Sequence, residues 1–281
     1  MNRPLVGALS ALLLGGATLV GVGAAPAAAS SSHPQAAQAV DFAGTVALSD
    51  CSGSVVRTAK SADTDPALVL SNGHCLESGF PSAGEVIVNQ SSSRSFTLLN
   101  SSGGNAGTVR ASKVAYATMT DTDVSLYQLT STYAQIQQRY GIKALQLSDS
   151  RPAQGTSIKV VSGYWKKIYS CTIDGFAYRL KEGDWTWKDS VRYTSACNTI
   201  GGTSGSPVVD SATGTVLAVN NTGNEDGARC TLNNPCEVDE SGAVTVRKGI
   251  NYAQQTYGIT KCVTTGNKID LSLAGCALPK P

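Results

Sequence analysis

The sequence predicts an all-β protein, and three observations favour this class. Short runs of alternating or β-branched residues recur along the chain, turns rich in Gly, Ser and Asn separate them, and the runs form two batches on either side of residues 133–145. Their spacing is compatible with closed barrels or with a sandwich. Two six-stranded lobes with a cleft between them fit the two batches, but composition alone does not choose them over one sandwich.

The expected strands differ in sequence between the two batches, and no internal repeat relates them. The first batch comprises Thr45–Leu48, Ser54–Thr58, Ala67–Leu70, Glu85–Val88, Phe96–Leu99, Val109–Tyr116 and Val124–Leu129. The second comprises Ser157–Gly163, Ile168–Ile173, Phe176–Leu180, Ser190–Thr194, Pro207–Val209, Thr215–Val219 and Ala243–Val246. Two segments depart from this pattern. Residues 133–145 predict a linker with a helical turn or two, and residues 248–258 predict a short closing helix near the C-terminus.

The first 29 residues have the composition of a secretory signal peptide. Arg3 supplies a charged start, Leu5 to Val22 is apolar, and Ala27 to Ala29 offer small residues for cleavage. A membrane anchor is the alternative, but the apolar run is short and broken by Gly. We therefore expect a secreted, extracellular protein that has no membrane association after cleavage, with residues 30–42 as a short N-terminal or pro-segment.

The charge balance of the chain narrows its possible partners. The chain has 22 basic and 20 acidic residues and no basic run, so we expect no nucleic-acid partner.

The eight cysteines of the chain all follow the signal, and an even number in an exported chain predicts disulfides. Joining sequential neighbours gives the pairs Cys51–Cys75, Cys171–Cys197, Cys230–Cys236 and Cys262–Cys276. A metal site is the alternative, but there is no CxxC and only one histidine near a cysteine, so we expect neither a metal nor a cofactor.

A Gly-rich loop, Gly201-Gly202-Thr203-Ser204-Gly205-Ser206-Pro207, contains a candidate nucleophile in Ser204. A serine hydroxyl is a weak nucleophile until a base takes its proton, and histidine is the usual base near neutral pH. The chain has two histidines, His33 and His74. Because His33 directly follows the predicted signal, His74 is the candidate base.

A third group, a carboxylate that orients the base, can be chosen by chain order. The α/β-hydrolase order needs a histidine after the serine, and none follows Ser204. The subtilisin order needs an aspartate before His74, but that fold alternates helices with strands and this chain does not. The remaining order selects Asp123, which leads an alternating apolar run. Asp121, on the same face of an extended strand, is the alternative.

With these flanking residues, the chain resembles the trypsin/chymotrypsin-like serine peptidases, most closely their bacterial secreted branch. The resemblance covers roughly residues 43 to 258 and is carried by the motifs Cys51-Ser52-Gly53-Ser54-Val55, Asn72-Gly73-His74-Cys75, Asp123-Val124-Ser125-Leu126 and Gly202-Thr203-Ser204-Gly205-Ser206-Pro207. It implies two six-stranded antiparallel β-barrels with the active site in the cleft between them and a short C-terminal helix. The lobes would be residues 43–132 and 146–258, with 133–145 as linker and 259–281 as a C-terminal extension.

The resemblance also implies a function, that of a secreted serine endopeptidase acting through an acyl-enzyme. His74, Asp123 and Ser204 would be its triad, the backbone N–H groups of Gly202 and Ser204 its oxyanion hole, and the Cys51–Cys75 disulfide the brace of the histidine loop. We expect a monomer that acts on protein or peptide substrates. A catalytically silent binding protein on the same fold is the alternative.

Two departures from the family pattern bear on activation and specificity. Thr203 stands where animal members carry an aspartate that pairs with a new N-terminus, so we expect no such switch. Asn198, six residues before the serine, stands where trypsins carry an aspartate, and no second histidine remains to bind glutamate. With Asn220 and Asn221, Asn198 forms the predicted specificity pocket, and polar or apolar side chains are the predicted preference.

Overall fold

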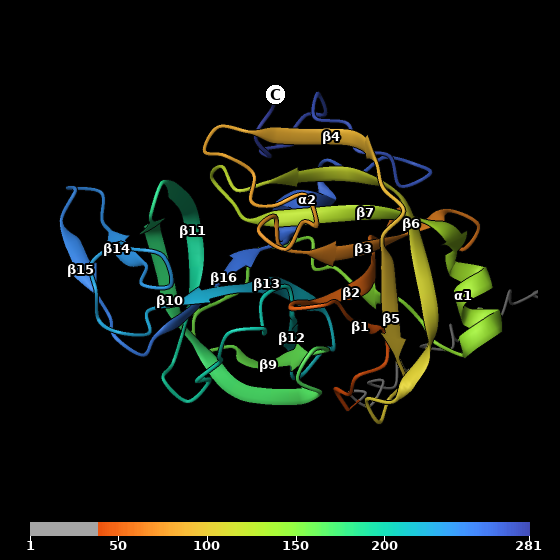
Figure 1. Ribbon diagram of the computed structural model, residues 1–281, viewed down its shortest axis with the longest axis horizontal. Coiled ribbons are helices and arrows are strands. Elements are labelled where there is room, and N and C mark those ends of the chain that lie inside the picture. Colours follow the sequence, from red (N-terminus) through yellow and green to blue (C-terminus); the bar gives the residue numbers. More distant parts are fainter. Residues whose placement is uncertain (1–38) are drawn as a thin grey trace, which may run out of the picture. The chain divides into compact units, whose positions relative to one another are not determined.

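A computed structural model describes residues 39–281, almost all of whose regular structure is strand (Figure 1). The predicted signal peptide, His33 and most of the predicted pro-segment lie outside the described residues. Among residues 39–281, no helix is long and apolar enough to cross a membrane.

The first barrel is closed by antiparallel pairing of six strands. Around the barrel their order is β1, β5, β6, β7, β3 and β2, and β2 pairs back onto β1. Two further strands lie outside this ring, β4 on β6 and β8 in parallel with β2. The strands are β1 (Thr45–Ala47), β2 (Ser52–Arg57), β3 (Pro66–Ser71), β4 (Val86–Ser91), β5 (Ser95–Leu99), β6 (Asn105–Thr118), β7 (Val124–Thr132) and β8 (Leu145–Gln146).

The second barrel closes in the same way, with β11, β16, β13, β12, β9 and β10 in order and β10 paired back onto β11. A hairpin of β14 and β15 extends the sheet from β10. The strands are β9 (Ser157–Ser162), β10 (Lys167–Glu182), β11 (Trp185–Tyr193), β12 (Pro207–Asp210), β13 (Val216–Gly223), β14 (Cys236–Val238), β15 (Val244–Val246) and β16 (Asn251–Gln255). The predicted fold class, all-β with two six-stranded antiparallel barrels, is confirmed.

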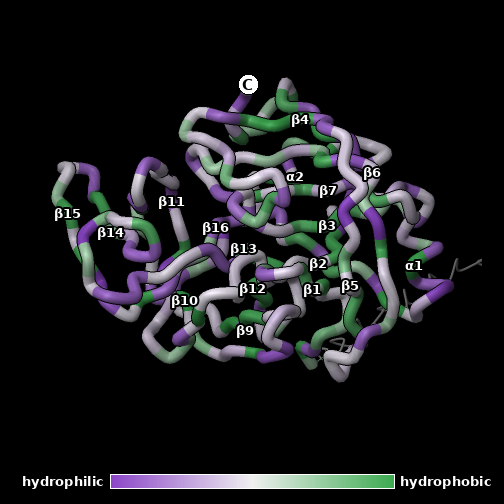
Figure 2. Tube along the Cα trace, viewed as in Figure 1, coloured by the Kyte–Doolittle hydropathy of each residue, from purple (hydrophilic) through white to green (hydrophobic). Residues whose placement is uncertain are grey.

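Alternation of apolar residues explains why these runs become barrel strands. Hydrophobic residues concentrate along the strands and hydrophilic ones in the outer turns (Figure 2). Side chains of one parity fill each barrel, such as Val69 and Tyr127 in the first and Val160 and Val208 in the second. The two runs predicted at 168–173 and 176–180 form the single strand β10, whose register shifts between Ile173 and Gly175.

The two predicted helical segments have different outcomes. In the linker, α1 (Tyr133–Tyr140) begins with a capping box of Thr132 and Gln135 and ends at Gly141, which has φ 70°. The predicted short C-terminal helix is present as α2 (Tyr257–Thr260). Its predicted bounds of 248–258 are wrong, because Asn251–Gln255 forms β16. Pairing decides this segment: β16 fills the space between β11 and β13 and so closes the barrel.

Residues 259–281 fold back onto the first barrel and help to join the two barrels. Ile259, Val263 and Leu278 pack in one apolar cluster with side chains from both barrels, including Leu68 and Val219. We call this set the interlobe cluster. Polar contacts fix the same segment, since the Asn267 side-chain amide donates to the carbonyl of Pro66 (2.8 Å) and the Tyr116 hydroxyl donates to that of Pro279 (3.0 Å).

Four disulfides link the described chain, and they join the cysteines in the pairs that sequence order predicts. These are Cys51–Cys75, Cys171–Cys197, Cys230–Cys236 and Cys262–Cys276. No cysteine in residues 39–281 is free. Each pair spans at most 26 positions, so each disulfide stabilises a local loop.

Candidate active site

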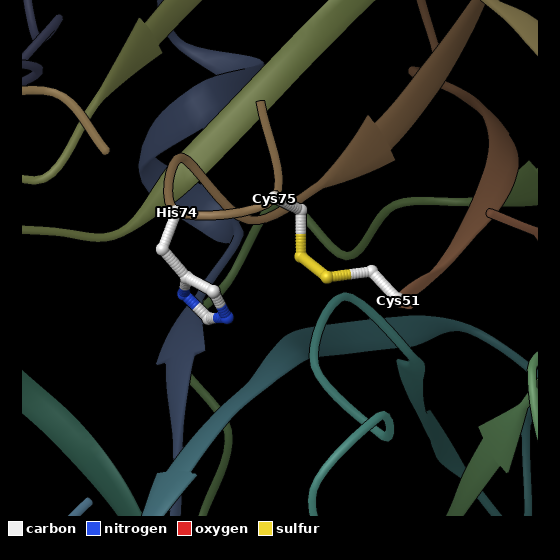
Figure 3. Close-up of side chains that lie close together, drawn as sticks. All are labelled: Cys51, His74 and Cys75. Carbon is white, nitrogen blue, oxygen red and sulfur yellow. A yellow bond between two sulfur atoms is a disulfide. The ribbon is translucent and has the colours of Figure 1, made fainter. Parts of the chain in front are cut away.

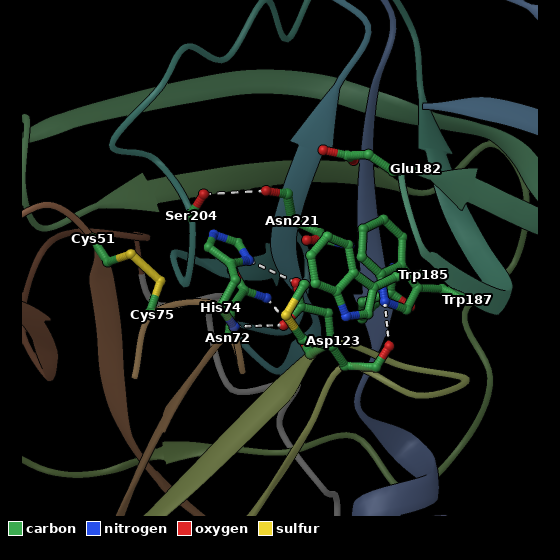
Figure 4. Close-up of polar contacts among 12 residues, drawn as sticks. Cys51, Asn72, His74, Cys75, Asp123, Glu182, Trp185, Trp187, Ser204 and Asn221 are labelled. Atoms are coloured by element: carbon green, nitrogen blue, oxygen red, sulfur yellow. Dashed lines mark hydrogen bonds and ion pairs between the residues drawn. A yellow bond between two sulfur atoms is a disulfide. The ribbon is translucent and has the colours of Figure 1, made fainter. Parts of the chain in front are cut away.

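His74 and Asp123 meet at one end of the first barrel. His74 lies in the turn after β3, and Asp123 directly precedes β7, which pairs with β3. The His74 Nδ1 is 2.6 Å from Asp123 Oδ2, and the His74 backbone N–H donates to Asp123 Oδ1 at 3.0 Å (Figure 4). Asp123 is fully buried, and the Asn72 amide donates to its carbonyl (2.8 Å). A carboxylate in this position keeps the proton on Nδ1 and leaves Nε2 free to act as a base.

The pair also changes the acidity of the imidazole. Burial lowers the pKa of His74, but the charge of Asp123 and the hydrogen bond to it raise the pKa, and the net direction is upward from 6.5. Asp121, the alternative partner, points elsewhere: it is half-exposed and pairs with Lys188. The structure therefore brings Asp123, and not Asp121, to His74.

Next to His74 lies the disulfide of Cys51 and Cys75 (Figure 3). The two sulfurs and the imidazole lie within 4.8 Å of one another, which is close enough to suggest a metal site. Because the sulfurs are bonded to each other, they offer no thiolate ligand. The arrangement instead ties the turn that carries His74 to β2.

Ser204 lies in the loop between β11 and β12, and backbone hydrogen bonds from both barrels hold this loop. The carbonyl of Ser204 accepts from the Ser52 N–H (2.7 Å), and the Gly205 N–H donates to the Asn220 carbonyl (2.9 Å). The Ser204 hydroxyl donates to the carbonyl of Asn221 (3.2 Å) and makes no hydrogen bond to His74 (Figure 4). Both side chains nevertheless line the same cavity.

The same loop presents unused N–H donors beside Ser204. Gly202 has φ 85°, a left-handed conformation that suits glycine, and the Thr203 N–H donates back to the Ile200 carbonyl (3.1 Å). Within residues 39–281 the N–H groups of Gly202 and Ser204 have no acceptor. Two free donors next to a serine hydroxyl can stabilise negative charge on a bound carbonyl oxygen.

Thr203 is held by neutral hydrogen bonds. Its side chain is buried, and its hydroxyl donates to the Ile200 carbonyl. The Asn220 side-chain amide donates to both the carbonyl (3.2 Å) and the hydroxyl (3.1 Å) of Thr203. The loop conformation thus has local support at the position where an ion pair is expected in animal members.

Gly205 is a position where a side chain cannot be accommodated. It has φ 79°, and a Cβ there would lie 2.0 Å from the Ser52 carbonyl oxygen and 2.3 Å from Ser71 Oγ. We expect Gly205→Ala to lower the free energy of unfolding by about 2–5 kcal/mol, from backbone strain and overpacking. Denaturant unfolding measures this, with Gly201→Ala as control, because a Cβ at Gly201 meets no atom within 4 Å. Equal stability of the two variants would contradict the expectation.

The cavity beside Ser204 has a volume of about 80 Å³. Its walls include three aromatic side chains, those of Phe80, Trp185 and Trp187, and residues 220–223 of β13. The predicted pocket residues Asn220 and Asn221 line it. Asn198 does not: it is exposed, and its φ of 44° belongs to a turn that leaves the next residue, Thr199, in the wall instead.

Glu182, the last residue of β10, is a wall residue that the sequence analysis missed. It is 4% exposed, and its Oε1 accepts from the Asn233 N–H (2.8 Å). Burial raises the pKa of Glu182. The alternation of β10 could have indicated that Glu182 is buried, because Glu182 points to the same face of the strand as the buried Leu180. A glutamate just before Gly183-Asp184, however, resembles an exposed turn residue.

Comparison with known proteins finds one family model that matches most of both barrels. The family model described as a trypsin-like peptidase domain matches residues 51–219, which include His74, Asp123 and Ser204. No curated protein sequence is similar enough to the chain to count as a match.

Solved structures with a similar chain trace are distant in sequence. The MamO protease domain of Magnetospirillum magneticum (apo form) is 13% identical with a TM-score of 0.49, over 79% of this chain and 97% of that one. The active form of the Rv3671c protease of M. tuberculosis is 15% identical with a TM-score of 0.46, over 84% and 82%. A thermostable serine protease from an extremophilic microorganism is 16% identical with a TM-score of 0.43, over 76% and 91%.

The family match spans more than half of the 281 residues, and the strand pairing forms two closed six-stranded barrels. The chain therefore belongs to the trypsin-like peptidase domain family.

Proposed function

We propose that this protein is a secreted serine endopeptidase that hydrolyses peptide bonds through an acyl-enzyme. The observation that carries the proposal is the hydrogen bond between His74 and a fully buried Asp123. His74 lines the same cavity as Ser204. Membership of the peptidase family supports protein or peptide substrates.

In the first half-reaction, Ser204 Oγ attacks the scissile carbonyl carbon while His74 Nε2 takes the hydroxyl proton. The carbonyl oxygen becomes negatively charged, and the N–H groups of Gly202 and Ser204 stabilise it. His74 then gives the proton to the leaving amine, and the C–N bond breaks to leave an ester on Ser204. In the second half-reaction, water attacks the ester with His74 again as the base, and the free acid and Ser204 hydroxyl are restored.

For this reaction the Ser204 hydroxyl must exchange its acceptor. It now donates to the Asn221 carbonyl at 3.2 Å, and the mechanism requires a change of side-chain rotamer that directs it to His74 Nε2. Catalytic hydrogen bonds are often long in unliganded enzymes and tighten when substrate binds. The neutral network around Thr203 supports an active loop that does not depend on pairing with a new N-terminus.

Export is part of the proposal. Residues 1–29 have the composition of a signal peptide, and four disulfides join residues of the described chain. Disulfides persist in oxidising compartments such as the extracellular space.

A fluorophosphonate reagent, which labels activated serines, tests the proposed nucleophile. We expect the secreted wild-type protein to be labelled and Ser204→Ala to remain unlabelled. Ser206→Ala is the matched control: it removes a hydroxyl two residues away whose buried Oγ has no partner in the described chain, so labelling should persist. Absence of label on the wild type would instead favour a silent binding protein on this fold.

A further inference from the structure

The cavity beside Ser204 is acidic. Two carboxylate residues, Glu182 and Glu225, line it, and no Lys or Arg of residues 39–281 does. Glu225 is exposed at the rim, whereas Glu182 is buried in the wall. In Figure 4, Glu182 lies beside Trp185, with its carboxyl group turned toward the side where Ser204 and Asn221 lie. The cavity therefore has one buried carboxyl group, that of Glu182, and one exposed carboxyl group at its rim.

Glu182 is held in place at one oxygen and left unpaired at the other. Its Oε1 accepts from the Asn233 N–H at 2.8 Å, and its Oε2 makes no protein hydrogen bond within residues 39–281. Burial raises the pKa of this carboxyl group, and the nearby Thr222 side chain lowers it. The Cys230–Cys236 loop positions this acid, because it contains Asn233 and because the Cys230 carbonyl accepts from the Gly183 N–H (2.8 Å). A buried carboxylate without a cationic partner costs free energy that a bound cation would recover.

Asn221 presents further unpaired polar atoms to the same space. Its side chain is 3% exposed and lines the cavity, and neither its Oδ1 nor its Nδ2 has a partner in residues 39–281. The Oδ1 can accept a hydrogen bond from a donor bound in this cavity. A neutral amide or hydroxyl would satisfy this oxygen but would leave the carboxylate charge of Glu182 uncompensated. An ammonium or guanidinium group supplies both donors and charge.

The rest of the wall suits the apolar stem of a long cationic side chain. Phe80 stacks edge-on between His74 (centroids 5.6 Å apart) and Trp185 (5.8 Å). Trp185 is fixed by donation from its indole N–H to the Pro81 carbonyl (2.9 Å). Aromatic faces attract cations and pack against methylene groups. The cavity volume of about 80 Å³ leaves room for several water-sized groups beside these aromatic side chains.

We propose that Glu182 is a specificity-determining residue, whose carboxylate binds the ammonium or guanidinium group of a Lys or Arg side chain of the peptide substrate. The proposal rests on the proposed function as a peptidase. It replaces the sequence-based prediction of a polar or apolar preference, which assumed that Asn198 sets the charge of the pocket. The acid comes from β10, a different part of the second barrel.

Paired peptide substrates test this assignment. Each is N-acetylated, so that no α-amino group competes, and carries either arginine or its neutral isostere citrulline at one position near the scissile bond. At one position we expect the wild type to favour arginine by about 30-fold or more in kcat/KM, the effect of a buried charge pair. Glu182→Gln keeps the shape and the Asn233 contact, and should reduce the ratio to about threefold or less. Asp184→Asn is the matched control, since Asp184 is exposed on the adjacent turn and does not line the cavity; its ratio should equal that of the wild type.

Two further measurements separate this proposal from the proposed function. Fluorophosphonate labelling of the wild type, Glu182→Gln and Asp184→Asn reports an intact nucleophile. Binding of the same peptide pairs to Ser204→Ala and to Ser204→Ala/Glu182→Gln, by fluorescence polarisation, reports recognition without turnover. Preferential binding of the arginine peptide that disappears with Glu182→Gln supports the assignment even if no peptide is cleaved. A labelled wild type without preference for arginine, or a preference that survives Glu182→Gln, would overturn it.

Discussion

Replacing Ser204 with alanine is expected to lower kcat about 10⁶-fold, and replacing His74 with alanine is expected to cost about the same. Each change removes a group that the other needs: without the base the hydroxyl keeps its proton, and without the hydroxyl the base has nothing to activate. The double variant Ser204→Ala/His74→Ala should therefore be no slower than either single variant. Rate constants at saturating substrate, compared with the uncatalysed rate, measure all three.

The residual rate is informative as well. The free N–H groups of Gly202 and Ser204 and the substrate cavity are unchanged in these variants, and such features alone retain about 10³–10⁴-fold acceleration over water. Losses that multiplied in the double variant would show that Ser204 and His74 do not act as one unit, and would contradict the proposed mechanism.

Asp123→Asn should lower kcat about 10⁴-fold and move the acid limb of the pH profile. The proposed reaction needs neutral His74 in the free enzyme, so kcat/KM falls as pH drops through the pKa of His74. Asp123 raises this pKa above 6.5, so the wild-type limb should lie above pH 6.5. In the variant the charge of Asp123 is lost while burial still lowers the pKa, and the limb should shift to lower pH.

Asp121→Asn is the matched control for this experiment. It removes a carboxylate two residues away that pairs with Lys188 rather than with His74. We expect its kcat and its acid limb to stay close to those of the wild type. A profile that shifts with Asp121→Asn, or one that stays fixed with Asp123→Asn, would contradict the assignment of Asp123 as the residue that orients His74.

The fold and the central residues could be predicted because they depend on local pattern and chain order. Alternation is a local property, and it located the runs that became β3 and β7. Chain order limits the choice to carboxylates between His74 and Ser204, and the alternating apolar run that follows Asp123 favours this residue. The structure places Asp123 against His74. By contrast, β16 was predicted as helix because its pairing with β11 and β13 is long-range and leaves little trace in its own residues.

The walls of the cavity could not be predicted for a related reason. Asn198 was chosen by counting back from Ser204, but a turn at φ 44° leaves it exposed. Glu182 stands 22 positions before Ser204 and reaches the cavity only because β10 pairs with β14 and the Cys230–Cys236 loop folds over its end. Because β10, β14 and the Cys230–Cys236 loop are separate in sequence, no local pattern indicates that they meet at the cavity.

The interlobe cluster affects the stage of synthesis at which the proposed active site can be completed. It joins Leu68 and Tyr116 of the first barrel to Val219 of the second, and Val263 and Leu278 complete it. A chain made from its N-terminus therefore carries His74 and Asp123 for the time needed to add more than a hundred residues before the cluster can form. The base lacks its proposed nucleophile until Ser204 has been added, and it lacks the packing that joins the two barrels until Leu278 has been added. We therefore expect the proposed activity to appear only after the C-terminal segment has packed against both barrels.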